Sequence, residues 1–222
     1  MTPTQRANGH NLHKTKPMVY KYICAKLWVM FGVVAPNIES SPNWDCLFEF
    51  AVGQEGHFTT KQAAEAGYSP QLLRKYLQNG RVIRVRRGVY RMVHFPAGEH
   101  EDLATLWLWS EQQGVFSHET ALMLHTLSDA LPRKVHLTLP TAWAKRRLRV
   151  PQGVILHHGD IPKRERVEVG AVPVTNVLRT LLDCVSAHVT PEFIEAAVRQ
   201  SRARRLIDQD DVKAIRARRR AA

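Results

Sequence analysis

The stretch that most constrains the fold of this chain is residues 56–92, GHFTTKQAAEAGYSPQLLRKYLQNGRVIRVRRGVYRM. Thr59 and Thr60 offer side-chain oxygens at the start of a short Ala-rich helix predicted over residues 62–66. Gly67 ends that helix, because glycine tolerates the positive φ that is common at a helix C-terminus. The first part of the stretch therefore predicts one short helix followed by a tight turn.

A second helix is predicted to begin after Ser69, a good N-cap residue, with Pro70 at the first helical position. Its apolar residues recur on one face at helical spacing: Leu72, Leu73, Tyr76 and Leu77. Its polar residues fall on the opposite face: Gln71, Arg74, Lys75 and Gln78. One face is thus expected to pack against the protein while the other faces outward.

After residue 80 the spacing of apolar residues changes from a helical period to a period of two. The strand over residues 82–86 is predicted to have two distinct sides, with Ile83 and Val85 on one and Val82, Arg84 and Arg86 on the other. Arg87 and Gly88 predict a tight turn into a returning strand over residues 89–92.

Two short helices followed by a basic hairpin, in this order, predict a winged helix-turn-helix. Its outward helix face would enter a DNA major groove, and the arginines of the hairpin would hold the backbone. The residues predicted to contact DNA are Thr60, Ser69, Gln71, Arg74, Lys75, Gln78, Arg84, Arg86 and Arg87. The alternative is a small helical subdomain whose charged face is merely solvated.

Charge supports a polyanionic partner. The 222 residues carry a net charge of +12 and a pI near 10.1. Residues 42–98 alone hold eight basic and four acidic residues. The three cysteines, Cys24, Cys46 and Cys184, are isolated, which argues against a disulfide framework or a thiolate zinc site and for a reducing cytosol.

The predicted fold class is α+β, with an N-terminal winged helix-turn-helix over residues 42–95 and a mixed α/β C-terminal domain over residues 99–222. Residues 1–41 are interpreted as disordered or as an extension caused by a mis-assigned start codon. The apolar stretch within them, residues 18–35, is interrupted by Lys21 and Lys26, which argues against a membrane-spanning helix. It also lacks a good cleavage site for a signal peptide, so a cytoplasmic protein is expected.

Periodicity and capping signals predict further elements. Helices are expected over residues 44–54, 99–113, 117–127, 176–187 and 191–202, and from residue 208, followed by a tail over 216–222. An alternating strand is expected over residues 134–140, a second strand over 153–158 and a hairpin over 166–175 around Gly170. Ser117 and Asn176 are expected to cap the helices that follow them.

The most basic loop lies within residues 141–150 and contains Lys145, Arg146, Arg147 and Arg149. Three interpretations stay open for this loop. It is a second phosphate-binding surface, a surface facing a protein partner, or an ordinary solvated loop.

Several residues invite a metal or nuclease hypothesis: His118, Glu119, His125, His157, His158 and Asp160. His118 and His125 are two helical turns apart, but no HExxH spacing exists. The acids after Asp160, which are Glu165 and Glu168, lack the lysine of a restriction-type Glu-x-Lys motif. We therefore predict no catalytic residue, no metal and no cofactor, and keep a DNA nuclease as the least favoured alternative.

Arg179 and Asp183, four residues apart, are interpreted as an ion pair on one helix face and not as a catalytic set.

Residues 45–185 resemble the AbiEi-type antitoxins of type IV toxin–antitoxin systems and their stand-alone relatives. The residues that carry the resemblance are the stretch 56–92 quoted above, then VFSHETALMLHTLSDALPRKVHLTLP, then GAVPVTNVLRTLLDC. The second and third blocks are the more specific ones at this spacing, because many winged helices look alike.

The resemblance implies a transcriptional repressor that binds inverted repeats in its own promoter. Because such operators pair two half-sites with two protein copies or two domains, a dimer on double-stranded DNA is expected. It also implies a second role, in which the protein counters a nucleotidyltransferase-like toxin in defence against phage. The C-terminal domain would serve both antitoxicity and cooperative DNA binding. The alternative is a stand-alone winged-helix regulator without a toxin partner.

Overall fold

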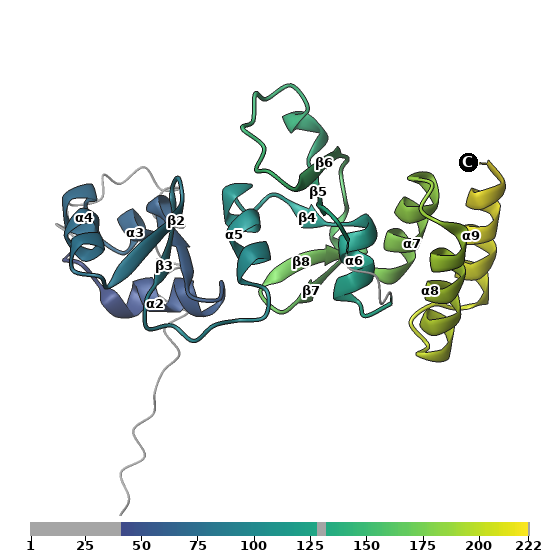
Figure 1. Ribbon diagram of the computed structural model, residues 1–222, viewed down its shortest axis with the longest axis horizontal. Helices are drawn as coiled ribbons and strands as arrows, with labels where there is room; N and C mark the ends of the chain where they lie inside the picture. The colour runs from purple at the N-terminus through teal and green to yellow at the C-terminus, as the bar shows by residue number, and fades with distance from the viewer. Residues whose placement is uncertain (1–40, 128–131, 222) are drawn as a thin grey trace, which may run out of the picture. The chain divides into compact units, whose positions relative to one another are not determined.

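The computed structural model describes residues 41–127 and 132–221 (Figure 1). The described residues all belong to one compact unit. The predicted N-terminal extension falls, except for residue 41, outside the described residues. No helix in residues 41–127 and 132–221 combines the length and the apolar character that crossing a membrane requires.

The N-terminal part of the described chain has the order predicted for a winged helix-turn-helix. Its elements are α2 (Trp44–Val52), β1 (His57–Thr59), α3 (Thr60–Glu65), α4 (Pro70–Gln78), β2 (Val82–Arg86) and β3 (Val89–Met92). The three strands form an antiparallel sheet in the order β1-β3-β2. No strand was predicted over His57–Thr59, and this segment forms the third strand because it pairs with β3.

One apolar core holds these elements together. Leu47 of α2, Phe58 of β1 and Leu73 of α4 are buried against one another, and Val82 and Met92 of the hairpin complete the cluster. The Asn43 side chain caps α2 by accepting a hydrogen bond from the Cys46 N–H over 3.0 Å. The predicted support helix is therefore present, although it ends two residues earlier than the predicted Gln54.

The following residues form a five-stranded mixed sheet with helices. The elements are α5 (Glu101–Trp109), β4 (Val115–Phe116), α6 (His118–Leu124), β5 (Val135–Leu139), the 3-10 turns η1 (Thr141–Trp143) and η2 (Lys163–Glu165), β6 (Val154–His158), β7 (Arg166–Val169), β8 (Val172–Thr175), α7 (Val177–Ser186), α8 (Pro191–Ala203) and α9 (Gln209–Ala221). The strand order is β6-β5-β4-β8-β7, with parallel pairs β5–β6 and β4–β8. The predicted α+β class and the winged helix at the N-terminal side are confirmed.

Two apolar clusters stabilise this part. One joins the sheet to α5 and α6 through Leu106, Phe116 and Leu137. The other lies among α7, α8 and α9, which run side by side in Figure 1, and includes Leu181 and Ile215.

Three predictions about the C-terminal part are wrong. The predicted tail is helical up to Ala221, because the Asp208 carboxylate accepts hydrogen bonds from two N–H groups of α9 and Ile215 is buried. Strand β5 does not alternate, since residues 136–139 are all buried in the interior of the sheet. The Ser117 side chain does not cap α6, because its hydroxyl bonds to Thr138 Oγ1 over 2.7 Å.

Hydrogen bonds join the winged helix to the chain that follows it. Arg91 of β3 forms an ion pair with Glu101 of α5, with 2.6 Å between Nη2 and Oε1. The buried Gln54 accepts a hydrogen bond from Gln112 over 2.9 Å. The predicted division between residues 42–95 and 99–222 stays a prediction.

Candidate nucleic-acid interface

The helix-turn-helix is fixed by capping interactions, of which the sequence predicted those of Thr59 and Ser69. Helix α3 spans Thr60–Glu65 and so begins two residues before the predicted range of 62–66. At the start of α3, the Thr59 hydroxyl accepts from the Gln62 N–H over 3.2 Å, and the Gln62 side chain accepts from the Thr59 N–H over 2.8 Å. Gly67 takes a φ of +83° in the turn. The Ser69 hydroxyl then accepts from the Leu72 N–H over 3.2 Å and begins α4.

Helix α4 has one packed face and one open face. Leu73 is buried in the core, while Leu72, Tyr76 and Leu77 are half-buried around it. The predicted groove-reading residues are all exposed: Gln71, Arg74, Lys75 and Gln78. Within residues 41–127 and 132–221, their side chains make no hydrogen bond or ion pair, so their donors point to solvent and are free to meet a ligand.

The wing is anchored to the start of α3. Both the backbone N–H and the hydroxyl of Thr60 donate to the Gly88 carbonyl, over 3.0 and 3.4 Å. Gly88, the second residue of the turn between β2 and β3, has a φ of +79°, a conformation that glycine adopts without steric strain. These bonds fix the turn that carries Arg87 beside the helix-turn-helix.

The three predicted wing arginines, Arg84, Arg86 and Arg87, are exposed. The side chain of Arg84 donates to the Arg86 carbonyl over 3.4 Å, and the pairing of β2 with β3 shifts register between these two residues. The shift is a β-bulge, which breaks the period of two that the sequence predicted.

The predicted sides of β2 are also only partly right. Val82 is buried at 1% exposure, so the side assigned to the arginines begins in the core, whereas Ile83 and Val85 on the other side are exposed. Because β2 is an edge strand with a bulge near its end, buried and exposed residues do not alternate along its five positions.

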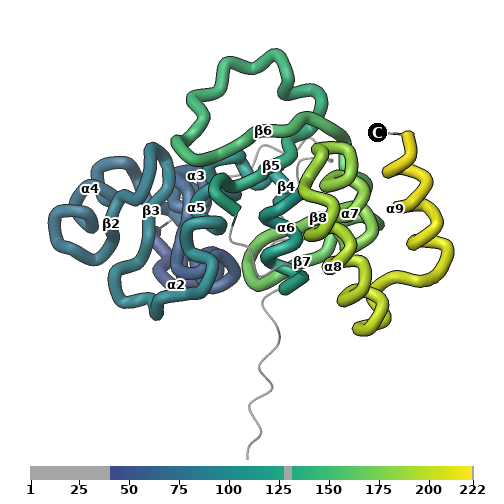
Figure 2. The backbone as a smooth tube through the Cα atoms, turned by 45° about the vertical axis from the view of Figure 1, so that its right-hand side comes forward, coloured from purple at the N-terminus to yellow at the C-terminus, as the bar shows by residue number. Residues whose placement is uncertain are grey.

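Figure 2 shows the long loop between β5 and β6 that carries the second basic surface. Its predicted cations are all exposed: Lys145, Arg146, Arg147 and Arg149. Arg146 stacks over the ring of Trp143, with 3.9 Å from its guanidinium carbon to the ring centroid, and lies 3.7 Å from a Glu111 oxygen. Part of this surface is therefore already engaged within the protein.

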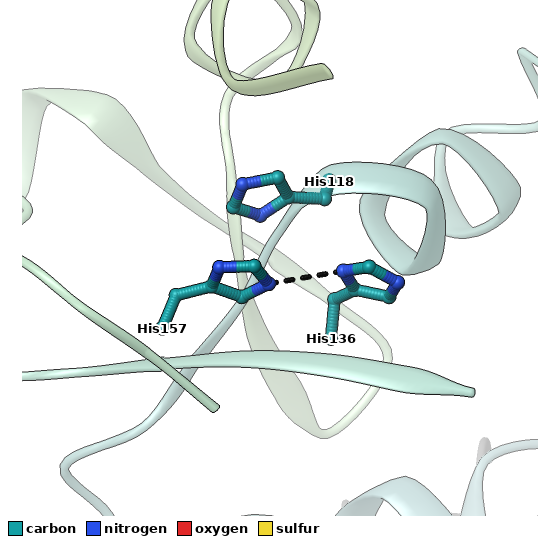
Figure 3. A group of neighbouring side chains, drawn as sticks. All are labelled: His118, His136 and His157. Carbon is teal, nitrogen blue, oxygen red and sulfur yellow. Dashed lines mark hydrogen bonds between the residues drawn. The ribbon is translucent and has the colours of Figure 1, made fainter. Parts of the chain in front are cut away.

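The histidines separate into different environments. His118, His157 and His136, which the sequence analysis missed, lie together (Figure 3). His125, which the sequence placed two helical turns after His118, instead follows the last residue of α6 and bonds through Nε2 to the Thr175 carbonyl over 2.7 Å. His158 is exposed next to the cluster.

The approach of His136 to His157 follows from the register of two strands and not from a local sequence pattern. Parallel pairing of β5 with β6 sets Thr138 opposite His157, and His136 lies two residues before Thr138 on the same side of its strand. The register was needed to see it.

The acids of the nuclease alternative do not converge on a metal-binding group among the described residues. Asp160 accepts a hydrogen bond from the Thr141 N–H over 3.1 Å. Glu165 and Asp183 both bind the Arg179 guanidinium over 2.8 Å. The predicted ion pair of Arg179 with Asp183 is confirmed, and burial raises the pKa of Asp183 against the opposing effect of Arg179.

A comparison with protein-family models finds one match, which lies in the winged helix. Residues 47–93 match the family model described as "Transcriptional regulator, AbiEi antitoxin". The match runs from within α2 to the end of the wing and confirms the inferred resemblance for that segment. It supports a role as a DNA-binding regulator.

The chain is also similar to the crystal structure of the RV2827C protein from Mycobacterium tuberculosis, at 15% sequence identity over 78% of this chain and 80% of that chain. The TM-score between the two structures is 0.38. A search of curated proteins found no match.

Proposed function

We propose that this protein is a cytoplasmic transcriptional repressor that binds operator DNA in its own promoter. The observation that carries the proposal is the free, outward polar face of α4 beside a basic wing. Helix α4 would enter the major groove, and the cations of the wing would hold phosphates on either side. The family match over residues 47–93 supports the same role.

The proposal divides the basic residues by task. Arg74 and Lys75, with Gln71 and Gln78, would read base edges. The arginines of the wing would neutralise phosphates without reading sequence. An arginine paired with a guanine is worth about 1–3 kcal/mol of discrimination against the wrong base.

The test compares two variants on two DNAs. Fluorescence anisotropy measures binding to the upstream promoter fragment and to a scrambled fragment of equal length. Arg74→Ala should lose affinity for the promoter alone, whereas Arg86→Ala should weaken binding to both fragments by a similar factor. Arg202→Ala is the matched control, because Arg202 is an exposed arginine on α8 and should behave as wild type.

If Arg74→Ala has the same affinity as Arg202→Ala for the promoter fragment and for the scrambled fragment, α4 is not the helix that reads the DNA sequence. Operators of inverted-repeat type pair two half-sites with two protein copies, so a dimer is proposed on DNA. A single shifted species with a protein-to-site ratio of one would argue against that dimer.

A second role follows from the antitoxin named in the family description. We infer that the chain counters a nucleotidyltransferase-like toxin encoded beside it, with the region after residue 99 and its basic loop as the contacting surface, in a phage-defence pair. When this chain is co-expressed with the neighbouring toxin gene, it should restore the growth of cells that the toxin inhibits. Growth equal to that with the toxin alone would leave a stand-alone regulator as the better account.

The proposal assigns no catalytic step to the chain. A nuclease would cut supercoiled DNA in the presence of Mg²⁺ or Mn²⁺, and such cleavage, abolished by changing Asp160, would overturn this assignment.

A further inference from the structure

Three imidazole rings from three different elements meet within the C-terminal part of the protein (Figure 3). His118 begins α6, His136 is on β5 and His157 is on β6. One ring nitrogen from each lies within 4.8 Å of the others, and His136 Nδ1 is 3.0 Å from His157 Nε2. Nitrogens bound to one tetrahedral zinc ion would be about 3.3 Å apart, given Zn–N bonds of about 2.0–2.1 Å.

The partners of two rings already fix which nitrogen faces inward. Glu119 Oε2 lies 3.2 Å from His136 Nε2, which places the proton on Nε2 and leaves the lone pair on Nδ1. Ser117 Oγ lies 2.8 Å from His118 Nδ1, which leaves His118 Nε2 as the free nitrogen. A carboxylate or hydroxyl behind a histidine is the usual outer support of a metal ligand.

The backbone of His118 is a second, independent observation. His118 has a φ of +52°, in the left-handed region. The other non-glycine residues of positive φ among the described residues, such as Thr126 and His188, lie two or three residues past the end of a helix, where that conformation is common. His118 instead stands at the start of a helix, and its ring stacks on that of His157 with 3.8 Å between centroids.

Two of the three rings, those of His118 and His136, are buried, and the ring of His157 is half-buried. Burial lowers the pKa of each, and that of His118 falls to about 3, with His157, His136 and Arg179 lowering it further. Glu119 acts in the opposite direction on His136.

We propose that His118 Nε2, His136 Nδ1 and His157 Nε2 bind a divalent transition-metal ion of the zinc class, with water in the fourth position. Imidazole nitrogen suits zinc, copper, cobalt and nickel and does not suit magnesium or calcium. The ion would replace the proton that His157 Nε2 shares with His136, and that proton would move to His157 Nδ1. The bound ion would cross-link α6 to β5 and β6 and stabilise that part of the fold.

The experiment uses the tag-free full chain after chelator treatment. Titration calorimetry with Zn²⁺ should give one site per chain, and Co²⁺ should give the intense visible absorption of tetrahedral coordination. The temperature of thermal unfolding should rise when Zn²⁺ is added. His157→Ala should lose the Co²⁺ spectrum and the thermal shift, while His158→Ala, its exposed neighbour on β6, should keep both.

Two further variants guard against misfolding of His157→Ala. His118→Asn keeps a residue that tolerates positive φ and should lose metal binding while unfolding like the metal-free wild type. Glu119→Gln should weaken binding about 10–100-fold, because it removes only the outer support of His136. Absence of Zn²⁺ binding by the wild-type chain, or equal binding by His157→Ala and His158→Ala, would overturn the proposal.

Discussion

The salt dependence of DNA binding follows directly from the exposed cations of the proposed interface. Five of them face outward on α4 and the wing, namely Arg74, Lys75, Arg84, Arg86 and Arg87. If each of these cations releases one condensed counterion from the duplex, whether it lies at a base edge or on a phosphate, the logarithm of the binding constant falls with the logarithm of salt concentration with a slope of about −4.5. Affinity for any duplex then falls about 500-fold between about 50 and 200 mM salt.

Arg86→Ala removes one of these contacts. The slope should become about −3.6, and the loss of affinity over the same range should shrink to about 150-fold. Fluorescence anisotropy titrations at four salt concentrations measure both slopes on the same labelled fragment. Arg202→Ala changes the net charge by the same amount outside the interface and should keep the wild-type slope.

Equal slopes for Arg86→Ala and the wild-type chain would mean that the wing does not lie on phosphates. A reduced slope for Arg202→Ala as well would mean that only net charge matters. Either result would refute the reasoning about the wing.

Two predictions concern stability. Asn176→Ala should lower the free energy of unfolding by about 0.5–2 kcal/mol, because the Asn176 side chain caps α7 by accepting from a backbone N–H over 2.9 Å; urea unfolding should show no such loss for the exposed Asn79→Ala. Burial lowers the pKa of His57, with Arg91 adding to the effect and Glu101 opposing it. As the pH falls, His57 is therefore protonated in the unfolded chain before it is protonated in the folded one. The free energy of unfolding should fall as the pH drops below about 6.5, by at most about 1.4 kcal/mol per pH unit. His57→Gln should lose less stability between pH 7 and 5, and an identical loss in both proteins would contradict this assignment.

The winged helix was predictable because its signals are local. Ser69, Pro70, Gly67 and the turn at Gly88 act through hydrogen bonds and backbone angles within a few residues, and the structure has them where the sequence indicated. The exposed side of α4 followed from helical spacing alone.

What the sequence did not reveal depends on distant parts of the chain. The approach of His136 to His157 needs the register of two parallel strands, which no local pattern supplies. Ser117 was predicted to cap a helix, but its hydroxyl forms a hydrogen bond with the Thr138 hydroxyl on β5 instead. The arginine-rich C-terminus looked like a tail, and it is helical because Ile215 packs among α7 and α8.

The central claim is that this protein reads DNA sequence with α4. Competition binding at physiological salt tests it most directly, with labelled promoter DNA displaced by unlabelled promoter or by unlabelled scrambled DNA. The account predicts that unlabelled promoter DNA displaces the labelled fragment at a concentration at least about 1,000-fold below that needed of scrambled DNA. This factor is the lower end of the range for specific regulators. Equal competition by the two DNAs would contradict it.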